Sequence, residues 1–202
     1  MAVEINDISK MEIKNVSTGE NEVLEDLWKD KSCVILFLRR WGCLYCRLWA
    51  KEVSQIAKTL HEKNIRLIGI GPEEVGVKEF AEGKYLDGEL YVDVNKKVYS
   101  KLSFKRYNYF SILCYILSKE GRRAYQKGKA SKLSWNLQGD YLQIGGALIV
   151  ENGGKLLYSF RQTGAADHLP NEKILEVLDL ASEIKMIDDN LDGSRESSPS
   201  DI

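Results

Sequence analysis

The stretch FLRRWGCLYCR, residues 37–47, places two cysteines, Cys43 and Cys46, three residues apart. It overlaps the end of an apolar, β-prone run from Cys33 to Leu38, which is typical of a buried strand. It is followed by a segment, reaching Leu60, in which apolar residues recur with helical spacing. The two cysteines are therefore predicted to lie where a strand turns into a helix.

This position favours redox chemistry. A cysteine at a helix N-terminus meets the positive end of the helix dipole, which favours the thiolate over the thiol. Arg39, Arg40 and Arg47 add positive charge nearby. A C-x-x-C pair beside alternating strands and helices, in a chain without secretory features, is typical of a redox motif. We therefore predict Cys43 as the nucleophile and Cys46 as the thiol that resolves the intermediate.

Two structural alternatives compete with this reading. A zinc site needs four nitrogen or sulfur ligands, usually in two closely spaced pairs. The remaining cysteines, Cys33 and Cys114, are isolated in the sequence. The two histidines, His61 and His168, lie far apart, so no metal site is predicted. The pair could also be inert thiols at the start of a helix, which would need neither this junction nor the flanking arginines.

Composition narrows the protein class. The 202 residues are 44% hydrophobic with a formal net charge of −1, which suits one domain with a sizeable core and gives no sign of a nucleic-acid partner. We expect one domain over residues 1–185 and a disordered, acidic, Ser-rich tail over residues 186–202. The N-terminus does not resemble a signal peptide, and no apolar run is long enough for stable membrane insertion. Four cysteines make no disulfide scaffold, so a reducing cytoplasm fits best.

The pattern of apolar residues predicts an α/β fold. A central mixed sheet flanked by helices, ending in a late β-hairpin at the turn ENGG (151–154), is compatible with a thioredoxin-like fold. The expected strands are residues 11–16, 34–38, 65–70, 90–93, 147–150 and 156–160. The expected helices are residues 23–28 (short), 43–62, 75–85, 96–102 and 173–184.

The segment between residues 104 and 146 is less regular. An apolar stretch at 111–117 predicts a packed helix, and residues 119–132 then carry six basic side chains against one acid. Such a run is most often a solvated basic face. A site for an anionic substrate or cofactor phosphate, or reversible contact with an anionic membrane, are the alternatives.

Several short motifs, in order and similarly spaced over residues 12–180, resemble the prostamide/prostaglandin F synthase group of the peroxiredoxin-like 2 family. Besides residues 37–47, the similar stretches are IRLIGIGP (65–72), GELYVD (88–93), FKRYN (104–108), NLQGD (136–140) and GGALIV (145–150).

The resemblance implies a thioredoxin-like fold and reduction of the 9,11-endoperoxide of prostaglandin H2, or of its ethanolamide, to the F2α products. Cys43 matches the first active-site cysteine of the family and Cys46 the second. The family's ultimate electron source is NADPH, used directly or through thioredoxin. The chain has no G-x-G-x-x-G motif, so no bound cofactor is predicted.

Departures from related families bear on the substrate. Ordinary peroxiredoxins carry proline and threonine where this chain has Leu36 and Arg40, so efficient turnover of hydrogen peroxide is not expected. Thioredoxins place a cis-proline at the position expected to match Gly146. A glycine there is expected to leave room above the cysteines for a bulky lipid.

The predicted reaction is attack of the Cys43 thiolate on the weak O–O bond, followed by displacement by Cys46. Because Arg39 and Arg40 follow each other at a strand end, they are expected to point to opposite faces, and at most one to reach the developing oxyanion. Trp41 and Tyr45 are expected either to wall an apolar groove or simply to pack. A general peroxide or thiol-disulfide reductase, or a redox-regulatory module, remain the rival functions.

Overall fold

The computed structural model describes residues 5–108 and 118–183, apart from the side chains of residues 120 and 124. The predicted helix at 111–117, Cys114 and the predicted tail at 186–202 lie outside the described residues. The described chain builds one seven-stranded sheet of order β2-β1-β5-β4-β3-β6-β7. Its strands are β1 (Glu12–Asn15), β2 (Asn21–Val23), β3 (Cys33–Phe37), β4 (Arg66–Gly71), β5 (Glu89–Val92), β6 (Gly146–Glu151) and β7 (Lys155–Arg161).

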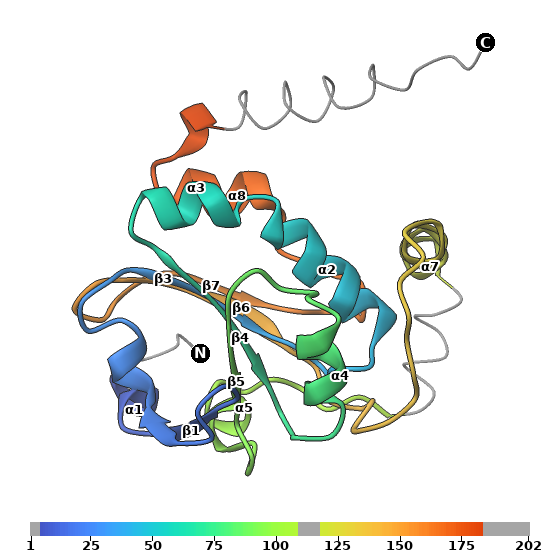
Figure 1. Ribbon diagram of the computed structural model, residues 1–202, viewed down its shortest axis with the longest axis horizontal. Helices are drawn as coiled ribbons and strands as arrows, with labels where there is room; N and C mark the ends of the chain where they lie inside the picture. The colour runs from blue at the N-terminus through green and yellow to red at the C-terminus, as the bar shows by residue number, and fades with distance from the viewer. Residues whose placement is uncertain (1–4, 109–117, 184–202) are drawn as a thin grey trace.

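The sheet is mixed. β3, β4 and β5 run parallel, β6 pairs antiparallel with β3, and β6 and β7 form the hairpin near the end of the chain. The predicted α/β architecture with a central mixed sheet and a late hairpin is therefore confirmed (Figure 1). The short β2, which closes a hairpin with β1 through Gly19 at a positive φ of 75°, was not expected, because three residues carry too little pattern.

Helices cover both faces of this sheet. In Figure 1, α2, α3 and α8 lie above it, and α1 and α5 lie below. The helical elements are α1 (Asn6–Ser9), the 3-10 turn η1 (Leu24–Leu27), α2 (Leu44–Ser54), α3 (Ala57–Glu62), α4 (Val77–Glu82), α5 (Lys97–Lys101), α7 (Lys119–Ala130), α8 (Asn171–Val177) and the 3-10 turn η2 (Ala181–Glu183).

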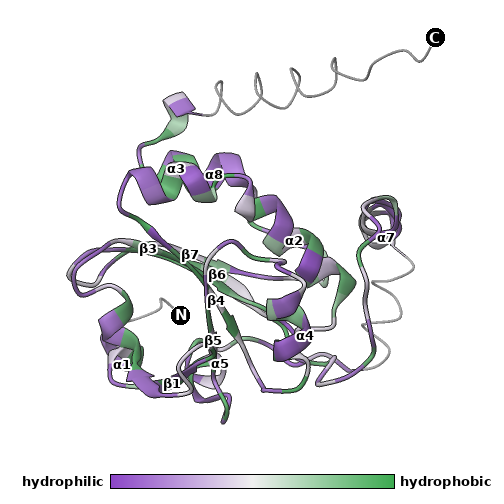
Figure 2. Cartoon of the chain, in the orientation of Figure 1, coloured by the Kyte–Doolittle hydropathy of each residue, from purple (hydrophilic) through white to green (hydrophobic). Residues whose placement is uncertain are grey.

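The core has two layers because β3 is apolar on both sides. Val34 and Leu36 face the cluster under α2, while Ile35 and Phe37 face the opposite cluster with α1 and α5. All of these side chains are fully buried, which explains the continuous apolar run in the sequence. Figure 2 shows the hydrophobic residues concentrated in the central strands, with mainly hydrophilic residues on α7.

The single helix predicted over residues 43–62 is wrong, because the chain breaks it into α2 and α3. The Ser54 hydroxyl donates to the carbonyl of Ala50 and accepts from the backbone N–H of Asp87. The next two residues, Gln55 and Ile56, bond three residues back instead of four. A serine hydroxyl that bonds to a carbonyl of its own helix bends or ends the helix, and so does a tightened turn. The spacing of apolar residues does not predict either feature.

The last predicted helix also differs. α8 begins earlier than the expected residue 173 and ends at Val177. Asp179 then takes a positive φ of 58°, which an α-helix cannot continue, and only the short turn η2 follows.

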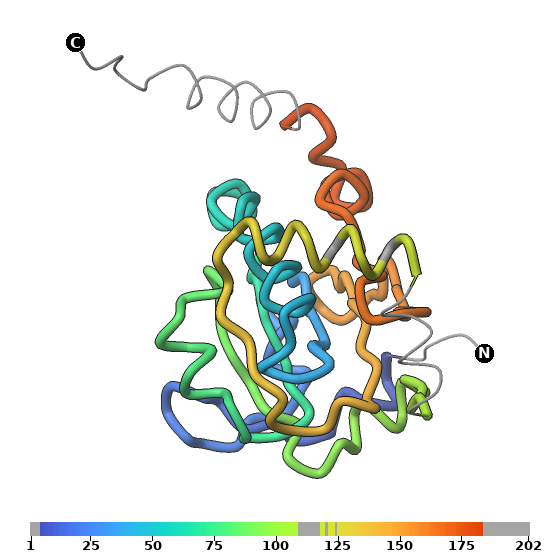
Figure 3. Tube along the Cα trace, turned by 90° about the vertical axis from the view of Figure 1, so that its right-hand side faces the viewer, coloured from blue at the N-terminus to red at the C-terminus, as the bar shows by residue number. Residues whose placement is uncertain are grey.

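The basic segment forms one helix, α7, which packs across α2 (Figure 3). The Ser118 hydroxyl caps its first turn by accepting from the backbone N–H of Gly121. Gly128 allows the close approach, since a Cβ there would lie 2.8 Å from the Leu44 side chain. Gly128 thus lets a very polar helix lie next to the start of α2.

Candidate active site

Cys43 lies at the junction between strand and helix, as predicted. β3 ends at Phe37, the chain crosses five residues, and Cys43 is the N-cap of α2 with an extended backbone (φ −76°, ψ 124°). Its carbonyl accepts the first helical hydrogen bond, from the N–H of Arg47, at 3.0 Å. The sulfur is therefore held at the positive end of α2.

The two thiols have opposite electrostatics. The pKa of the Cys43 thiol is held well below its usual value, first because the Cys46 thiol donates a hydrogen bond to its sulfur, and then because of the positive charges of Arg39 and Arg40. Burial opposes this shift without reversing it. The pKa of Cys46 is raised well above its usual value, first by burial and then by the bond it donates and the charge of Cys43. The two shifts thus favour the thiolate at Cys43 and the thiol at Cys46.

Arg39 is fixed against the thiolate. Its Nη1 lies 3.6 Å from the Cys43 sulfur. Its Nε donates to the carbonyl of Gln143 and its Nη2 to that of Tyr141, at 3.2 and 2.9 Å. The loop between α7 and β6 therefore clamps this guanidinium in place, and the side chain is almost fully buried.

Arg40 lies on the same side of the chain as Arg39, so the expectation that the two point to opposite faces is wrong. The pleated strand ends at Phe37, and the alternation of a strand does not extend to these residues. One nitrogen of Arg40 donates to the carbonyls of Asn136 and Gln138, at 2.5 and 2.9 Å. Its buried Nε has no hydrogen-bond partner among the described residues.

A cavity of about 300 Å³ opens onto Cys43. Tyr45 lies in its wall, nearly buried, and its hydroxyl donates to the carbonyl of Gly121 on α7 at 3.1 Å. The lining residues are Arg39, Arg40, Cys43, Leu44, Tyr45, Tyr125, Trp135, Leu137, Tyr141 and Ala165. The last five of these residues, from Tyr125 onward, could not be predicted from the sequence. They come from α7, the following loop and the segment after β7, and share no motif with residues 37–47.

Trp41 does not wall this cavity, so the alternative of ordinary packing is correct for it. Its side chain is fully buried, its Nε1 donates to the carbonyl of Glu73 at 2.6 Å, and its ring packs against Phe80. Gly71 leaves the space that the indole fills, since a Cβ there would lie 2.3 Å from the ring.

The expectation that Gly146 leaves room above the cysteines is also wrong. A Cβ at Gly146 would lie 2.2 Å from the carbonyl oxygen of Phe160 and 2.7 Å from the ring of Phe104. Phe104 belongs to the core cluster on the face of the sheet away from α2. The glycine therefore allows close packing beneath the sheet and opens no space over the dithiol.

Arg47 does not act on the thiolate either. Its guanidinium is fully buried and donates to the carbonyl of Trp41, to both oxygens of Ser134 and to the carboxylate of Glu79. It also lies over the ring of Tyr85, 4.6 Å from its centre. Arg47 thus ties α2 to α4 and to the loop that follows α7.

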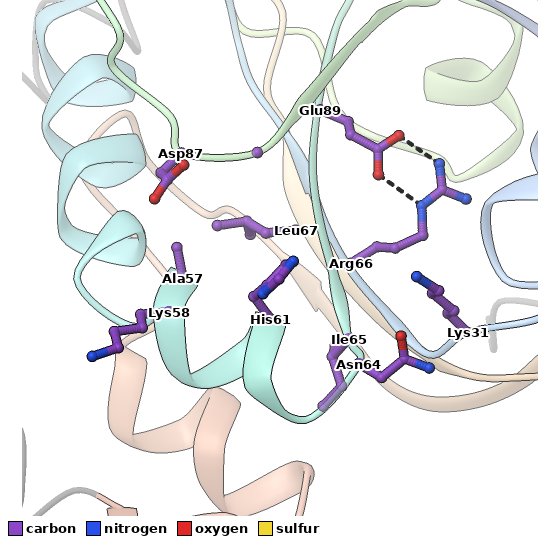
Figure 4. A pocket seen from close by; sticks show the side chains of 11 residues that line it. Lys31, Ala57, Lys58, His61, Asn64, Ile65, Arg66, Leu67, Asp87 and Glu89 are labelled. Carbon is purple, nitrogen blue, oxygen red and sulfur yellow. Dashed lines mark hydrogen bonds and ion pairs between the residues drawn. The ribbon is translucent and has the colours of Figure 1, made fainter.

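A larger cavity of about 610 Å³ lies at the other end of the parallel strands (Figure 4). Its most prominent cation, Arg66, is held by both oxygens of Glu89, as the dashed lines show. It contains no cysteine, and the buried Cys33 near it has its pKa raised to about 12, chiefly by burial. The nucleophile therefore belongs to the smaller, more apolar cavity.

Within residues 5–108 and 118–183, no group of three or more His, Cys, Asp or Glu side chains is arranged to hold a metal ion. No helix in the described part of the chain has the length and apolarity needed to cross a bilayer.

Replacing Arg39 by methionine is expected to raise the pKa of Cys43, because the variant keeps the bulk of the side chain but loses a positive charge beside the sulfur. The pH dependence of Cys43 alkylation by a small reagent measures this shift. The profile of the wild-type chain should fall only at a pH well below that of an ordinary thiol, and the variant's profile should move to higher pH. Arg66→Met is the matched control, because Arg66 does not line the Cys43 cavity. Equal profiles for both variants would contradict the role of Arg39 in lowering the pKa of Cys43.

Residues 52–164 match the model of the AhpC/TSA antioxidant enzyme family. The match begins after the two cysteines, so the placement of the dithiol depends on the geometry above. The chain is 44% identical over 173 residues to a human protein named prostamide/prostaglandin F synthase, covering 85% of this chain and 87% of the relative. A bullfrog protein (Aquarana catesbeiana) of the same name is 44% identical over 183 residues, covering 90% and 91%.

Solved structures match the fold. Peroxiredoxin Q of Xanthomonas campestris superposes with a TM-score of 0.58 at 10% identity, covering 91% of this chain and 97% of that one. Peroxidoxin BcpB of Mycobacterium tuberculosis gives 0.55 at 19% identity, covering 86% and 92%. At these identities the likeness concerns the fold alone, and it confirms the predicted thioredoxin-like architecture.

Proposed function

The chain belongs to the prostamide/prostaglandin F synthase family within the AhpC/TSA group, and from this premise we propose that it reduces a lipid endoperoxide with its own dithiol. The proposed substrates are prostaglandin H2 and its ethanolamide, prostamide H2, and the products are the F2α compounds.

One observation carries the proposal: the Cys43 sulfur, favoured as a thiolate, lies in a cavity walled mainly by aromatic and aliphatic side chains. An apolar site with one polar reactive group suits a lipid whose only reactive feature is a strained O–O bond. Binding the acyl chains against Tyr45 and Leu44 would hold that bond near the sulfur and supply part of the rate by orientation.

The proposed chemistry balances within the dithiol. The Cys43 thiolate attacks one peroxide oxygen, an S–O bond forms, the O–O bond breaks, and the other oxygen leaves as an alkoxide. The Cys46 thiol gives its proton to this alkoxide, and its sulfur attacks the sulfur of Cys43. The S–O bond then breaks, the second oxygen takes a proton from solvent, and a disulfide remains. The lipid gains two electrons from the two sulfurs, one proton from Cys46 and one proton from solvent.

The two arginines have separate proposed roles. Arg39 contacts the sulfur and stabilises the thiolate before the reaction. Arg40 has a buried Nε–H without a partner among the described residues. This N–H is proposed to donate a hydrogen bond to the developing alkoxide. Of the two arginines, only Arg40 then stabilises the oxyanion.

A reductant must restore the thiols after each turnover. We propose NADPH as the ultimate electron source, delivered directly or through thioredoxin or another dithiol protein, with no cofactor resident in the chain. The proposed compartment is the cytoplasm, where thiols stay reduced.

Product analysis tests this function. Reduced protein mixed with one equivalent of prostaglandin H2 should yield prostaglandin F2α and a Cys43–Cys46 disulfide, while Cys33 stays free; mass spectrometry reads both. A thioredoxin system should then make turnover continuous. If kcat/KM for hydrogen peroxide, or for a protein disulfide, equalled that for the endoperoxide, the chain would instead be a general peroxide or thiol-disulfide reductase. If no substrate were turned over, a redox-regulatory role would remain.

A further inference from the structure

The mouth of the Cys43 cavity gathers the exposed apolar side chains of the molecule. Six large apolar side chains are exposed among the described residues, and four of them line this cavity: Tyr125, Trp135, Leu137 and Tyr141. Leu137 is the most exposed, at 70%. Such a cluster around one opening differs from the singly scattered apolar residues of an ordinary surface, and it marks a surface for contact with another apolar body.

Positive charge lies beside this cluster. Tyr125 is on α7, and Arg122 and Lys129 stand three residues before and four residues after it, so all three share one side of the helix. Both basic side chains are exposed, and neither forms an ion pair with a described carboxylate. Arg123 and Lys132 are likewise exposed, and in Figure 1 α7 lies at the outer edge of the molecule. The whole chain carries a net charge of only −1, so this concentration of cations is local.

We infer that α7 and the loop after it form a docking surface for an anionic membrane, with the mouth of the Cys43 cavity facing the lipid. Basic side chains beside exposed tryptophan, tyrosine and leucine are the combination with which proteins bind the interface of an anionic bilayer. The inference rests on the proposed function, because an apolar substrate partitions into membranes and would reach Cys43 directly from the bilayer. A nucleic acid or another polyanion would use the cations but would leave Leu137 without a role.

The test measures binding to vesicles without any substrate. Trp135 is the reporter, because it is half exposed while the other three tryptophans, Trp28, Trp41 and Trp49, are buried. Vesicles of phosphatidylcholine partly replaced by phosphatidylserine should shift the emission of the chain to shorter wavelength and protect it from acrylamide. Vesicles of phosphatidylcholine alone should do so much less.

Two variants separate charge from apolar contact. Arg122→Gln with Lys129→Gln should weaken binding to the anionic vesicles roughly 30-fold, since each basic residue near such a surface contributes roughly a fivefold factor. Leu137→Ser should weaken it about tenfold by removing inserted apolar area. Lys10→Gln with Lys58→Gln removes the same charge from α3 and the end of α1, remote from α7 in Figure 1, and should change nothing.

Several outcomes would overturn the inference: no binding to anionic vesicles, equal weakening by both charge pairs, or equally tight binding to heparin with no change at Trp135. A concentration-dependent shift of Trp135 without vesicles would assign the surface to a second copy of the chain instead. The proposed function stands or falls separately, because reduction of endoperoxide dispersed in solution does not require a membrane. A chain that reduced the endoperoxide but did not bind vesicles would contradict only the docking surface.

Discussion

Replacing Cys43 by serine is expected to lower the rate of endoperoxide reduction by about 10⁴-fold or more, the scale seen when an enzyme loses its nucleophile. A serine hydroxyl is not ionised at neutral pH and cannot form the S–O and S–S bonds of the proposed steps. The fold should be kept, because serine is a favourable N-cap and differs from cysteine by one atom. Loss of prostaglandin H2 and appearance of the F2α product measure the effect.

Two other cysteine variants serve as controls for this result. Cys33→Ala should keep nearly full activity, because Cys33 is buried near the opposite end of β3 and its raised pKa keeps it a thiol. Cys46→Ser should allow the first attack on the peroxide but stop the release by disulfide formation, so a single turnover would leave lipid attached to Cys43. A Cys43→Ser chain that kept a substantial part of its activity would refute the assignment of the nucleophile.

Replacing Arg47 by methionine is expected to destabilise the protein by about 2–5 kcal/mol, since each buried acceptor left without its donor costs about 1–3 kcal/mol. The guanidinium is fully buried, and its loss would leave the carbonyls of Trp41 and Ser134 without their donor. The methionine retains most of the packing but none of the hydrogen bonds. Denaturant unfolding, followed by far-UV circular dichroism, gives the free energy of unfolding.

The control for this variant is the partner carboxylate. Glu79→Gln keeps the shape of the side chain, which is about half exposed, and should cost about 1 kcal/mol or less, as exposed ion pairs do. In the folded Arg47→Met variant the alkylation profile of Cys43 should stay close to that of the wild type, because Cys46, Arg39 and Arg40 are the main groups that lower the pKa of Cys43. Equal losses of stability for both variants, or a shifted profile, would contradict this account.

The strongest local patterns predicted the fold well. The run CVILF is apolar at every position because β3 is buried on both faces, and the turn ENGG marks the β6–β7 hairpin. The predicted helix boundaries were wrong where a side chain or a backbone angle ended a helix. Ser54 does this between α2 and α3, and Asp179 does it after α8. Such events depend on contacts with distant residues, here the N–H of Asp87, which periodicity does not contain.

The same division holds for the site. The local sequence was enough to place Cys43 and Cys46 at the start of a helix after a buried strand, because chain neighbours fix that junction and its dipole. The side chains that surround the sulfur, in contrast, depend on long-range packing. That packing buries Arg47 and Trp41, brings Arg39 against the Cys43 sulfur, and makes α7 and its loop part of the cavity wall. The physical reason is that a buried donor goes to whichever acceptor the fold places within reach, and the acceptors of Arg39, the carbonyls of Tyr141 and Gln143, lie about a hundred residues away along the chain.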